Sequence, residues 1–165
     1  MVDYTTTLYQ ALPDLSDWAE RGIAPPQSSN YEVADGQVVL AADGRNRHGI
    51  QPVATVRINR EESAEIKPGE RATIQVTAVV PKGTGRVVRA TWCLDESKQF
   101  THPVDMKQAT YSADGEEVTF DTTISYERPG TYFPTVKIFS ERNGDANTPY
   151  TCIANLGKVR VIVKE

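Results

Sequence analysis

The stretch 128–139, which reads Arg-Pro-Gly-Thr-Tyr-Phe-Pro-Thr-Val-Lys-Ile-Phe, constrains the fold more than any other part of the chain. Pro129 and Gly130 suit a tight turn, because proline presets one backbone dihedral and glycine tolerates positive φ. Side chains alternate along an extended strand, so one set after the turn faces a single side: Tyr132, Pro134, Val136 and Ile138. The pattern predicts a half-buried strand of a β-sandwich, with Tyr132 at a sheet corner.

Further alternating segments follow residue 50, separated by turn residues. The clearest runs from Ala72 to Val80, and another is expected to place Val88, Ala90, Trp92 and Leu94 on its inner face. The remaining segments lie near 54–58, 107–111, 118–126 and 159–163. Together with the 128–139 strand they predict an all-β fold, a seven-stranded antiparallel immunoglobulin-like sandwich over residues 50–165. Its core should hold Trp92, Pro129, Gly130, Tyr132, Val136 and Ile138.

Residues 1–49 have a different pattern and are expected to be the tail of a neighbouring domain. Residues 11–21 predict a short amphipathic helix, with Pro13 in its first turn and Gly22 just after its end. A proline-rich connector follows at 24–30, and a hairpin at 31–41 turns at Asp35-Gly36. Residues 42–49 are polar and predict a linker.

Exposed aromatic side chains indicate where a ligand or a partner protein can bind. Phe133 and Phe139 fall on the strand face opposite Tyr132, Tyr150 lies in a predicted loop, and Trp18 lies on the helix. Such rings stack on sugars or pack against apolar protein surfaces. The favoured interpretation is that Phe133 and Phe139 are covered by the helix or by another domain. Leu12, Leu15 and Trp18 form an apolar stripe that must itself be covered, by the sandwich or by another chain.

Charge and hydropathy exclude some classes of partner. The 165 residues carry a net charge of -4, and the lysines and arginines are scattered, which disfavours nucleic acid. The apolar runs are only strand-sized and no polybasic run is present, so a membrane partner is not expected. The first residues also lack the pattern of a signal peptide.

Catalytic and metal sites are not expected. No serine lies in a Gly-x-Ser-x-Gly context, and His48 and His102 are interpreted as loop residues. Calcium ligands at Asp95-Glu96 or in the loop 143–147 are the weaker alternative to ordinary turns. Cys93 and Cys152 are interpreted as unpaired thiols, because Cys93 should point away from the core if Trp92 points into it. A Cys93–Cys152 disulfide is the alternative, and no cofactor is expected.

The motifs around Trp92 and Pro129 resemble those of the PKD family of immunoglobulin-like domains. Trp92 matches the tryptophan of the family's third strand, and Pro129, Gly130, Tyr132, Val136 and Ile138 match its sixth-strand motif. The family's Gly-Asp-Gly loop is replaced here by residues 93–98. The resemblance covers the last two thirds of the chain and implies an extracytoplasmic location.

Residues 11–25 resemble the last helix of tannase/feruloyl-esterase-like α/β-hydrolases, in which Ala-Leu-x-x-Trp-Val-Glu-x-Gly-x-Ala-Pro recurs. That family's catalytic histidine precedes this helix and its nucleophilic serine lies far upstream, and neither is in this chain. The two resemblances imply a non-catalytic accessory domain, a spacer, stabiliser or docking surface, from the C-terminal end of a larger hydrolase-like protein. Its expected partner is the neighbouring domain or another copy of itself. The alternative is an autonomous carbohydrate- or matrix-binding module, and a third hypothesis is a minimal esterase.

Overall fold

The computed structural model describes residues 4–41, 43–95 and 97–165. Among them a single α-helix, α1 (Thr5–Arg21), precedes a series of β-strands. The strands are β1 (Tyr31–Ala34), β2 (Gln37–Leu40), β3 (Val53–Ile58), β4 (Ser63–Ile66), β5 (Ala72–Val79), β6 (Arg86–Cys93), β7 (His102–Pro103), β8 (Thr110–Tyr111), β9 (Glu117–Ile124), β10 (Gly130–Tyr132), β11 (Thr135–Glu141), β12 (Ile153–Lys158) and β13 (Arg160–Val163). A short 3-10 helix, η1 (Gly44–Asn46), lies between β2 and β3.

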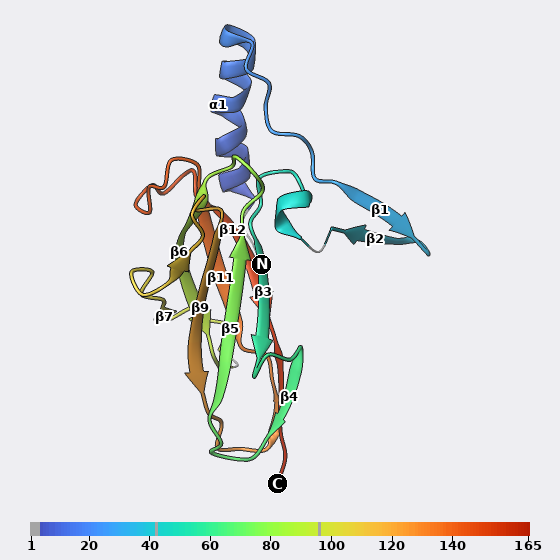
Figure 1. Cartoon of the computed structure of the whole chain (residues 1–165), viewed down its shortest axis with the longest axis vertical. Coiled ribbons are helices and arrows are strands. Elements are labelled where there is room, and N and C mark those ends of the chain that lie inside the picture. Colours follow the sequence, from blue (N-terminus) through green and yellow to red (C-terminus); the bar gives the residue numbers. More distant parts are fainter. Residues whose placement is uncertain (1–3, 42, 96) are drawn as a thin grey trace.

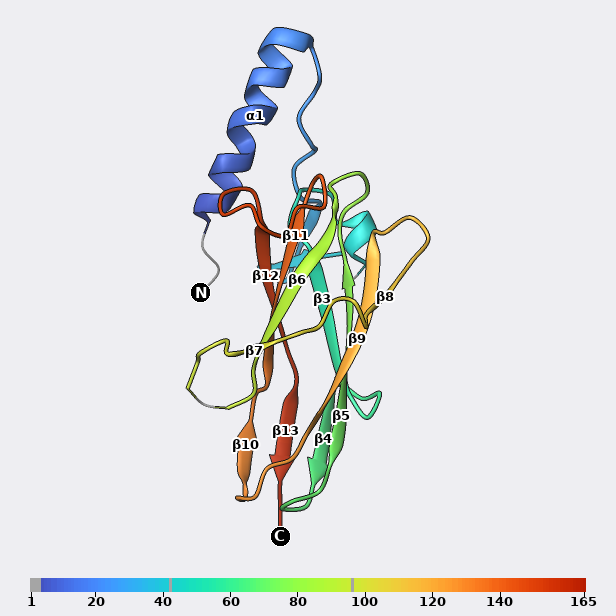
Figure 2. The same ribbon diagram turned by 90° about the vertical axis from the view of Figure 1, so that its left-hand side faces the viewer.

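Two four-stranded sheets form the body of the molecule, in the orders β3-β5-β9-β8 and β12-β11-β6-β7. A three-stranded sheet, β10-β13-β4, extends the body at the end where the C-terminus lies (Figures 1 and 2). The helix and the separate hairpin β1-β2 project from the opposite end (Figure 1). The chain is therefore mostly β, with immunoglobulin-like packing of antiparallel sheets and one N-terminal helix.

The core lies between the two sheets. Ile74, Val76 and Ala78 of β5 are fully buried, as their alternation predicts, and Val136 and Ile138 of β11 face them from the other sheet. Trp92 is 2% exposed and meets Phe120 edge-on, with ring centroids 6.4 Å apart. Burial of these side chains is the main stabilising contribution to the fold.

The predicted seven-stranded, all-antiparallel arrangement is wrong in detail. Strands β4, β7 and β12 were not predicted, and β13 pairs with β4 in parallel. The predicted strand after Pro129 is divided in two: β10 pairs with β13, whereas β11 pairs with β6 and β12. Pro134 lies at this division and lacks the amide hydrogen that a ladder needs, so the strand changes sheets there.

Val88 does not face the core as predicted. In the pairing of β6 with β11, Phe139 lies opposite Arg89 and Ser140 lies opposite Val87, which leaves Val88 as the extra residue of a β-bulge. The inward positions are consequently Val87, at 1% exposure, and Ala90, at 0%. An extra residue shifts the alternation by one, and side-chain spacing alone does not reveal it.

Tyr132 forms a tyrosine corner. It is half-buried against the core, its hydroxyl donates to the carbonyl of Arg128 at 2.9 Å, and its ring stacks on Tyr126 with centroids 3.9 Å apart. Burial raises the pKa of Tyr126 to about 12, so this hydroxyl stays protonated and donates to the Leu94 carbonyl at 2.7 Å. The two tyrosines connect the turn at Pro129 to the sheets. Pro129 and Gly130 are themselves exposed, so the prediction that they lie in the core is wrong: they lie at the turn where β10 begins.

Tyr132→Phe is expected to lower the free energy of unfolding by about 1 kcal/mol, because it removes one hydrogen bond and keeps the stacked ring. Urea denaturation monitored by circular dichroism measures this change. Tyr31→Phe is the control. Because Tyr31 is 60% exposed, this variant should have the same free energy of unfolding as the unmodified chain. Equal stability of Tyr132→Phe and the unmodified chain would show that the corner hydrogen bond contributes nothing.

Candidate functional site

The N-terminal arm, residues 4–41, carries the most exposed apolar surface of the described chain. It comprises α1, an extended connector and the hairpin β1-β2. The helix ends where the sequence predicts: Gly22 has φ 68°, and the amides of Gly22 and Ile23 donate to the carbonyls of Trp18 and Asp17. It begins earlier than predicted, so Pro13 lies inside it and not in its first turn. Proline has no amide hydrogen, so it leaves the carbonyl of Tyr9 without its helical donor.

The helix contacts the sandwich through polar side chains. Gln10 and Asp14 are its buried residues, at 6% and 8% exposure. The carboxylate of Asp14 accepts two hydrogen bonds from the guanidinium of Arg142, one of them at 3.1 Å, and so forms a two-pronged ion pair with the loop after β11. Tyr9 meets Tyr150 edge-on, with ring centroids 5.4 Å apart. These contacts set the orientation of the helix.

The apolar side of the helix consequently faces away from the sandwich. Leu8, Leu12, Leu15 and Trp18, which we call the apolar stripe, are 57%, 63%, 57% and 57% exposed. The stripe is therefore not covered by the sandwich of its own chain. Phe133 and Phe139 do not lie beneath the helix either: Phe133 is 52% exposed, and Phe139 lies under the guanidinium of Arg89.

A groove and a hairpin extend the apolar surface. The groove, of about 690 Å³, lies between α1 and the connector and is lined by Leu15, Trp18, Pro25 and Pro26 among others. Every residue of β1 and β2 is exposed. The exposed large apolar side chains of the hairpin are Tyr31, Val33, Val38, Val39 and Leu40. An isolated two-stranded ribbon is marginally stable in water, so this surface is suited to being covered by another protein.

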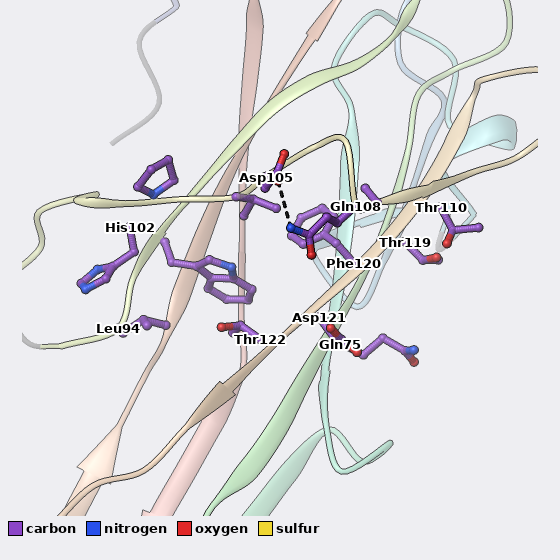
Figure 3. Close-up of a pocket in the computed structure, with 14 residues that line it drawn as sticks. Gln75, Leu94, His102, Asp105, Gln108, Thr110, Thr119, Phe120, Asp121 and Thr122 are labelled. Atoms are coloured by element: carbon purple, nitrogen blue, oxygen red, sulfur yellow. Dashed lines mark hydrogen bonds between the residues drawn. The ribbon is translucent and has the colours of Figure 1, made fainter.

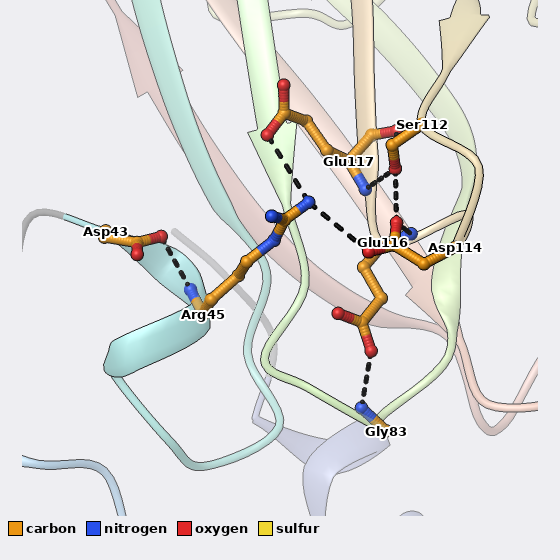
Figure 4. A network of polar contacts seen from close by, with 7 residues as sticks. All are labelled: Asp43, Arg45, Gly83, Ser112, Asp114, Glu116 and Glu117. Atoms are coloured by element: carbon orange, nitrogen blue, oxygen red, sulfur yellow. Dashed lines mark hydrogen bonds and ion pairs between the residues drawn. The ribbon is translucent and has the colours of Figure 1, made fainter.

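The segment after the hairpin fixes the arm to the sandwich. Asp43 caps η1 by accepting from the amide of Arg45, and the Arg45 guanidinium lies 3.6 Å from Asp114 and 3.7 Å from Glu117 (Figure 4). Gly44 is buried, and a Cβ there would lie 3.0 Å from that of Val79. Gly44 and Arg45 thus contact the sandwich from within the segment 42–49 that the sequence predicts as a linker; Ala42 lies outside the described residues.

Arg142→Ala is expected to loosen the helix without unfolding the sandwich. The change leaves the buried Asp14 without its cation, which should lower the free energy of local opening by about 2 kcal/mol. Amide hydrogens of α1 should then exchange more than tenfold faster. Hydrogen exchange followed by mass spectrometry measures the exchange rates of the helix and of the sandwich separately. Arg60→Ala, an exposed arginine after β3, is the control; helix exchange that is equal in the two variants would contradict this docking mode.

A polar cleft of about 480 Å³ lies beside β7 and β9 (Figure 3). Gln75, His102, Asp121 and Thr122 line it, and Gln108 donates to Asp105 at its rim. His102 is exposed, with its Nδ1 3.2 Å from the hydroxyl of Thr101. His48 is also exposed and has φ 56°, a left-handed conformation typical of a turn. His48 thus lies in an exposed turn, whereas His102 lies in the exposed strand β7 and not in the loop that the sequence predicts.

The side chains at the candidate metal positions make hydrogen bonds within turns. In the loop 143–147, Asp145 accepts from the amide of Asn147, and Glu141 accepts from the amides of Asn143 and Asp145. Asp95 accepts from Ser97, and Glu96 lies outside the described residues. In the part of the chain that the structure describes, no three His, Cys, Asp or Glu side chains are grouped to hold a metal ion.

Cys93 and Cys152 are unpaired and buried. Cys93 was expected to point outward, and it does lie on the face opposite Trp92. It is nevertheless buried, because the following loop folds over it: its sulfur donates to the carbonyl of Asp95 at 3.3 Å. Burial raises the pKa of the Cys152 thiol, which makes it a poor nucleophile near neutral pH.

Comparisons with known proteins give no family. No family model matches the chain, and no curated protein matches it. Among solved structures, the chain is similar to BcpA, the major pilin subunit of Bacillus cereus, with a TM-score of 0.41 and 17% identity over 69% of this chain. It spans only 41% of that pilin. It is also similar to the CARDB domain of PF1109 from Pyrococcus furiosus, with a TM-score of 0.38 and 16% identity over 70% of this chain and 97% of that domain.

Within the described ranges, no helix combines the length and the hydropathy that a membrane crossing requires. The arrangement of the described chain thus combines a β-sandwich body with an arm that holds its apolar stripe away from that body.

Proposed function

We propose that this chain is a non-catalytic accessory domain that attaches to a neighbouring, hydrolase-like domain through the apolar stripe of its N-terminal arm. One observation carries the proposal: α1 contacts its own sandwich through Gln10 and Asp14 and leaves Leu12, Leu15 and Trp18 exposed. A helix that served only its own sandwich would bury its apolar side. The reverse orientation is the one that a docking helix needs.

The energetics favour a partner. Covering a leucine or tryptophan side chain contributes about 1.5–3 kcal/mol, and the stripe offers four large side chains. The Arg142–Asp14 ion pair and the contacts of Gly44 and Arg45 already fix the arm, so binding orders few additional groups. Less conformational entropy is therefore lost on association.

The two sequence resemblances support the proposed type of this domain and the proposed identity of its neighbour. A PKD-like body agrees with the tyrosine corner at Tyr132 and with the buried Trp92. In the tannase/feruloyl-esterase-like hydrolases that residues 11–25 resemble, the corresponding helix is the last one of the catalytic domain. We place the neighbouring domain on the N-terminal side for this reason, and an extracytoplasmic location follows from the PKD resemblance.

The experiment begins with the reading frame that encodes this chain. A domain with a Gly-x-Ser-x-Gly motif is expected upstream in the same frame. Produced separately, that domain should co-elute with the 165-residue chain in size-exclusion chromatography. A frame with no upstream domain, or two proteins that elute apart at micromolar concentration, would contradict the proposal. Self-association of the chain alone would assign the stripe to a second copy.

A further inference from the structure

The outer face of the sheet β12-β11-β6 points away from the core, so core packing does not explain which side chains it carries. In the register of these strands, Arg89 lies beside Phe139, Thr91 beside Lys137, and Thr135 beside Lys158. The outward residues of this region are Arg89, Thr91, Cys93, Thr135, Lys137, Phe139, Ala154, Leu156 and Lys158, and none of them is acidic. The residue that follows Phe139 on this side of β11 is Glu141. It is buried, and its carboxylate accepts hydrogen bonds from the amides of Asn143 and Asp145.

Cations lie over aromatic rings across this face. The guanidinium carbon of Arg89 is 4.2 Å from the centroid of Phe139. The ammonium of Lys137 lies between two rings, 5.1 Å from Phe139 and 5.9 Å from Phe100. Lys158 lies 5.8 Å from Phe133. Cation–π attraction holds the cations in place without neutralising them, so their charge remains available to an anion.

A groove of about 460 Å³ crosses the same face. Phe100 and Phe133 are the aromatic residues that line it, and Lys98 and Lys158 are its lysines. Asp95 is the carboxylate among the described residues that line it, and this carboxylate already accepts from the amide and hydroxyl of Ser97. The described lining thus carries two ammonium groups and one carboxylate, an excess of positive charge in a protein whose net charge is -4.

We propose that this groove binds a carboxylated polysaccharide. A pyranose ring has an apolar face that stacks on an aromatic ring, and the half-exposed Phe133 offers such a ring beside Lys158. The carboxylates of successive acidic sugars would meet Lys158 and Lys98, whose ammonium groups act as point charges. The groove is open along a sheet face, which suits a polymer lying across it.

The charges favour this ligand over nucleic acid. Duplex or single-stranded nucleic acid is bound by a larger set of cations, and its affinity comes mainly from phosphate contacts. Here Lys98, Lys137, Lys158 and Arg89 are the cations of the face, in an otherwise acidic molecule. An acidic peptide would form ion pairs with the lysines but would leave Phe133 without a flat partner to stack on.

The test is fluorescence anisotropy of a labelled oligogalacturonide titrated with the full 165-residue chain. Saturable binding is expected, and it should weaken as the salt concentration rises. Lys158→Glu and Phe133→Ala should each weaken it about tenfold. Lys67→Glu, the same charge change in the turn after β4, should have no effect. Leu15→Asp should also have no effect, because the apolar stripe is a different surface.

Competition identifies the class of ligand. Unlabelled polygalacturonate should displace the label, whereas dextran, poly(dT) and polyglutamate at the same concentration should not. Displacement by poly(dT) or polyglutamate would replace the proposal with nucleic acid or an acidic peptide. Absence of binding, displacement by the neutral dextran, or an equal loss of binding in Lys67→Glu would overturn it.

Discussion

Replacing Trp92 with alanine is expected to lower the free energy of unfolding by about 3–5 kcal/mol, the largest effect of any single change considered. Trp92 is 2% exposed, lies opposite Val136 in the pairing of β6 with β11, and contacts Phe120. Truncation removes this buried apolar surface and leaves a cavity that two paired sheets cannot easily close. The indole nitrogen has no hydrogen-bond partner among the described residues, so the loss comes from packing alone.

Urea denaturation measures this change through the transition midpoint, and the slope should be unchanged if the denatured state is unaffected. Trp18→Ala is the matched control, because the same side chain is removed from a position that is 57% exposed. Its stability should change by less than about 0.5 kcal/mol. If Trp18→Ala destabilises the chain as much as Trp92→Ala, the helix belongs to the core and the docking proposal fails.

Leu15→Asp and Trp18→Asp should each weaken binding to the neighbouring domain by about a hundredfold. Truncating a central interface residue costs about 2–4 kcal/mol, and a charge placed in an apolar contact adds a desolvation cost. A loss of about 2.8 kcal/mol corresponds to a hundredfold weaker affinity. Neither change should unfold the isolated chain, since both side chains are exposed in it.

Titration calorimetry with the neighbouring domain measures the affinity. Ser16→Asp introduces the same charge one position from Leu15 but on another side of the helix, where it should leave the affinity within a factor of about three. An affinity that falls equally in Leu15→Asp and Ser16→Asp would indicate a general charge effect. Unchanged affinity in both Leu15→Asp and Trp18→Asp would move the interface away from the stripe.

The sheets could be predicted where side chains alternate without interruption. Strand β5 is one such case, since Ala72, Ile74, Val76 and Ala78 all face the core. Strand β12 could not be predicted in the same way, because its sequence Ile-Ala-Asn-Leu-Gly-Lys has no regular alternation. Its Gly157 approaches β3 so closely that a Cβ would lie 2.7 Å from the Cγ2 of Val56. Such a close approach depends on the tertiary arrangement, which local patterns do not encode.

The candidate site could be predicted in its composition but not in its orientation. The apolar stripe is visible as helical periodicity at Leu12, Leu15 and Trp18. The face that meets the sandwich is chosen by Asp14 and Arg142, which are 128 residues apart in the chain. No periodicity connects two such residues, and hydrophobicity alone gives the opposite orientation. The cationic groove was missed for the same reason, since Lys98, Phe133 and Lys158 come together only in the folded sheets.

The most direct measurement of the central claim is acrylamide quenching of Trp18 fluorescence. The signal of Trp18 is obtained as the difference between the unmodified chain and Trp18→Phe, which removes the contribution of the buried Trp92. In the dilute 165-residue chain Trp18 should be quenched as a solvated indole is, and in the presence of the neighbouring domain it should be shielded. Shielding already present in the dilute chain, or equal quenching with and without that domain, would contradict the account.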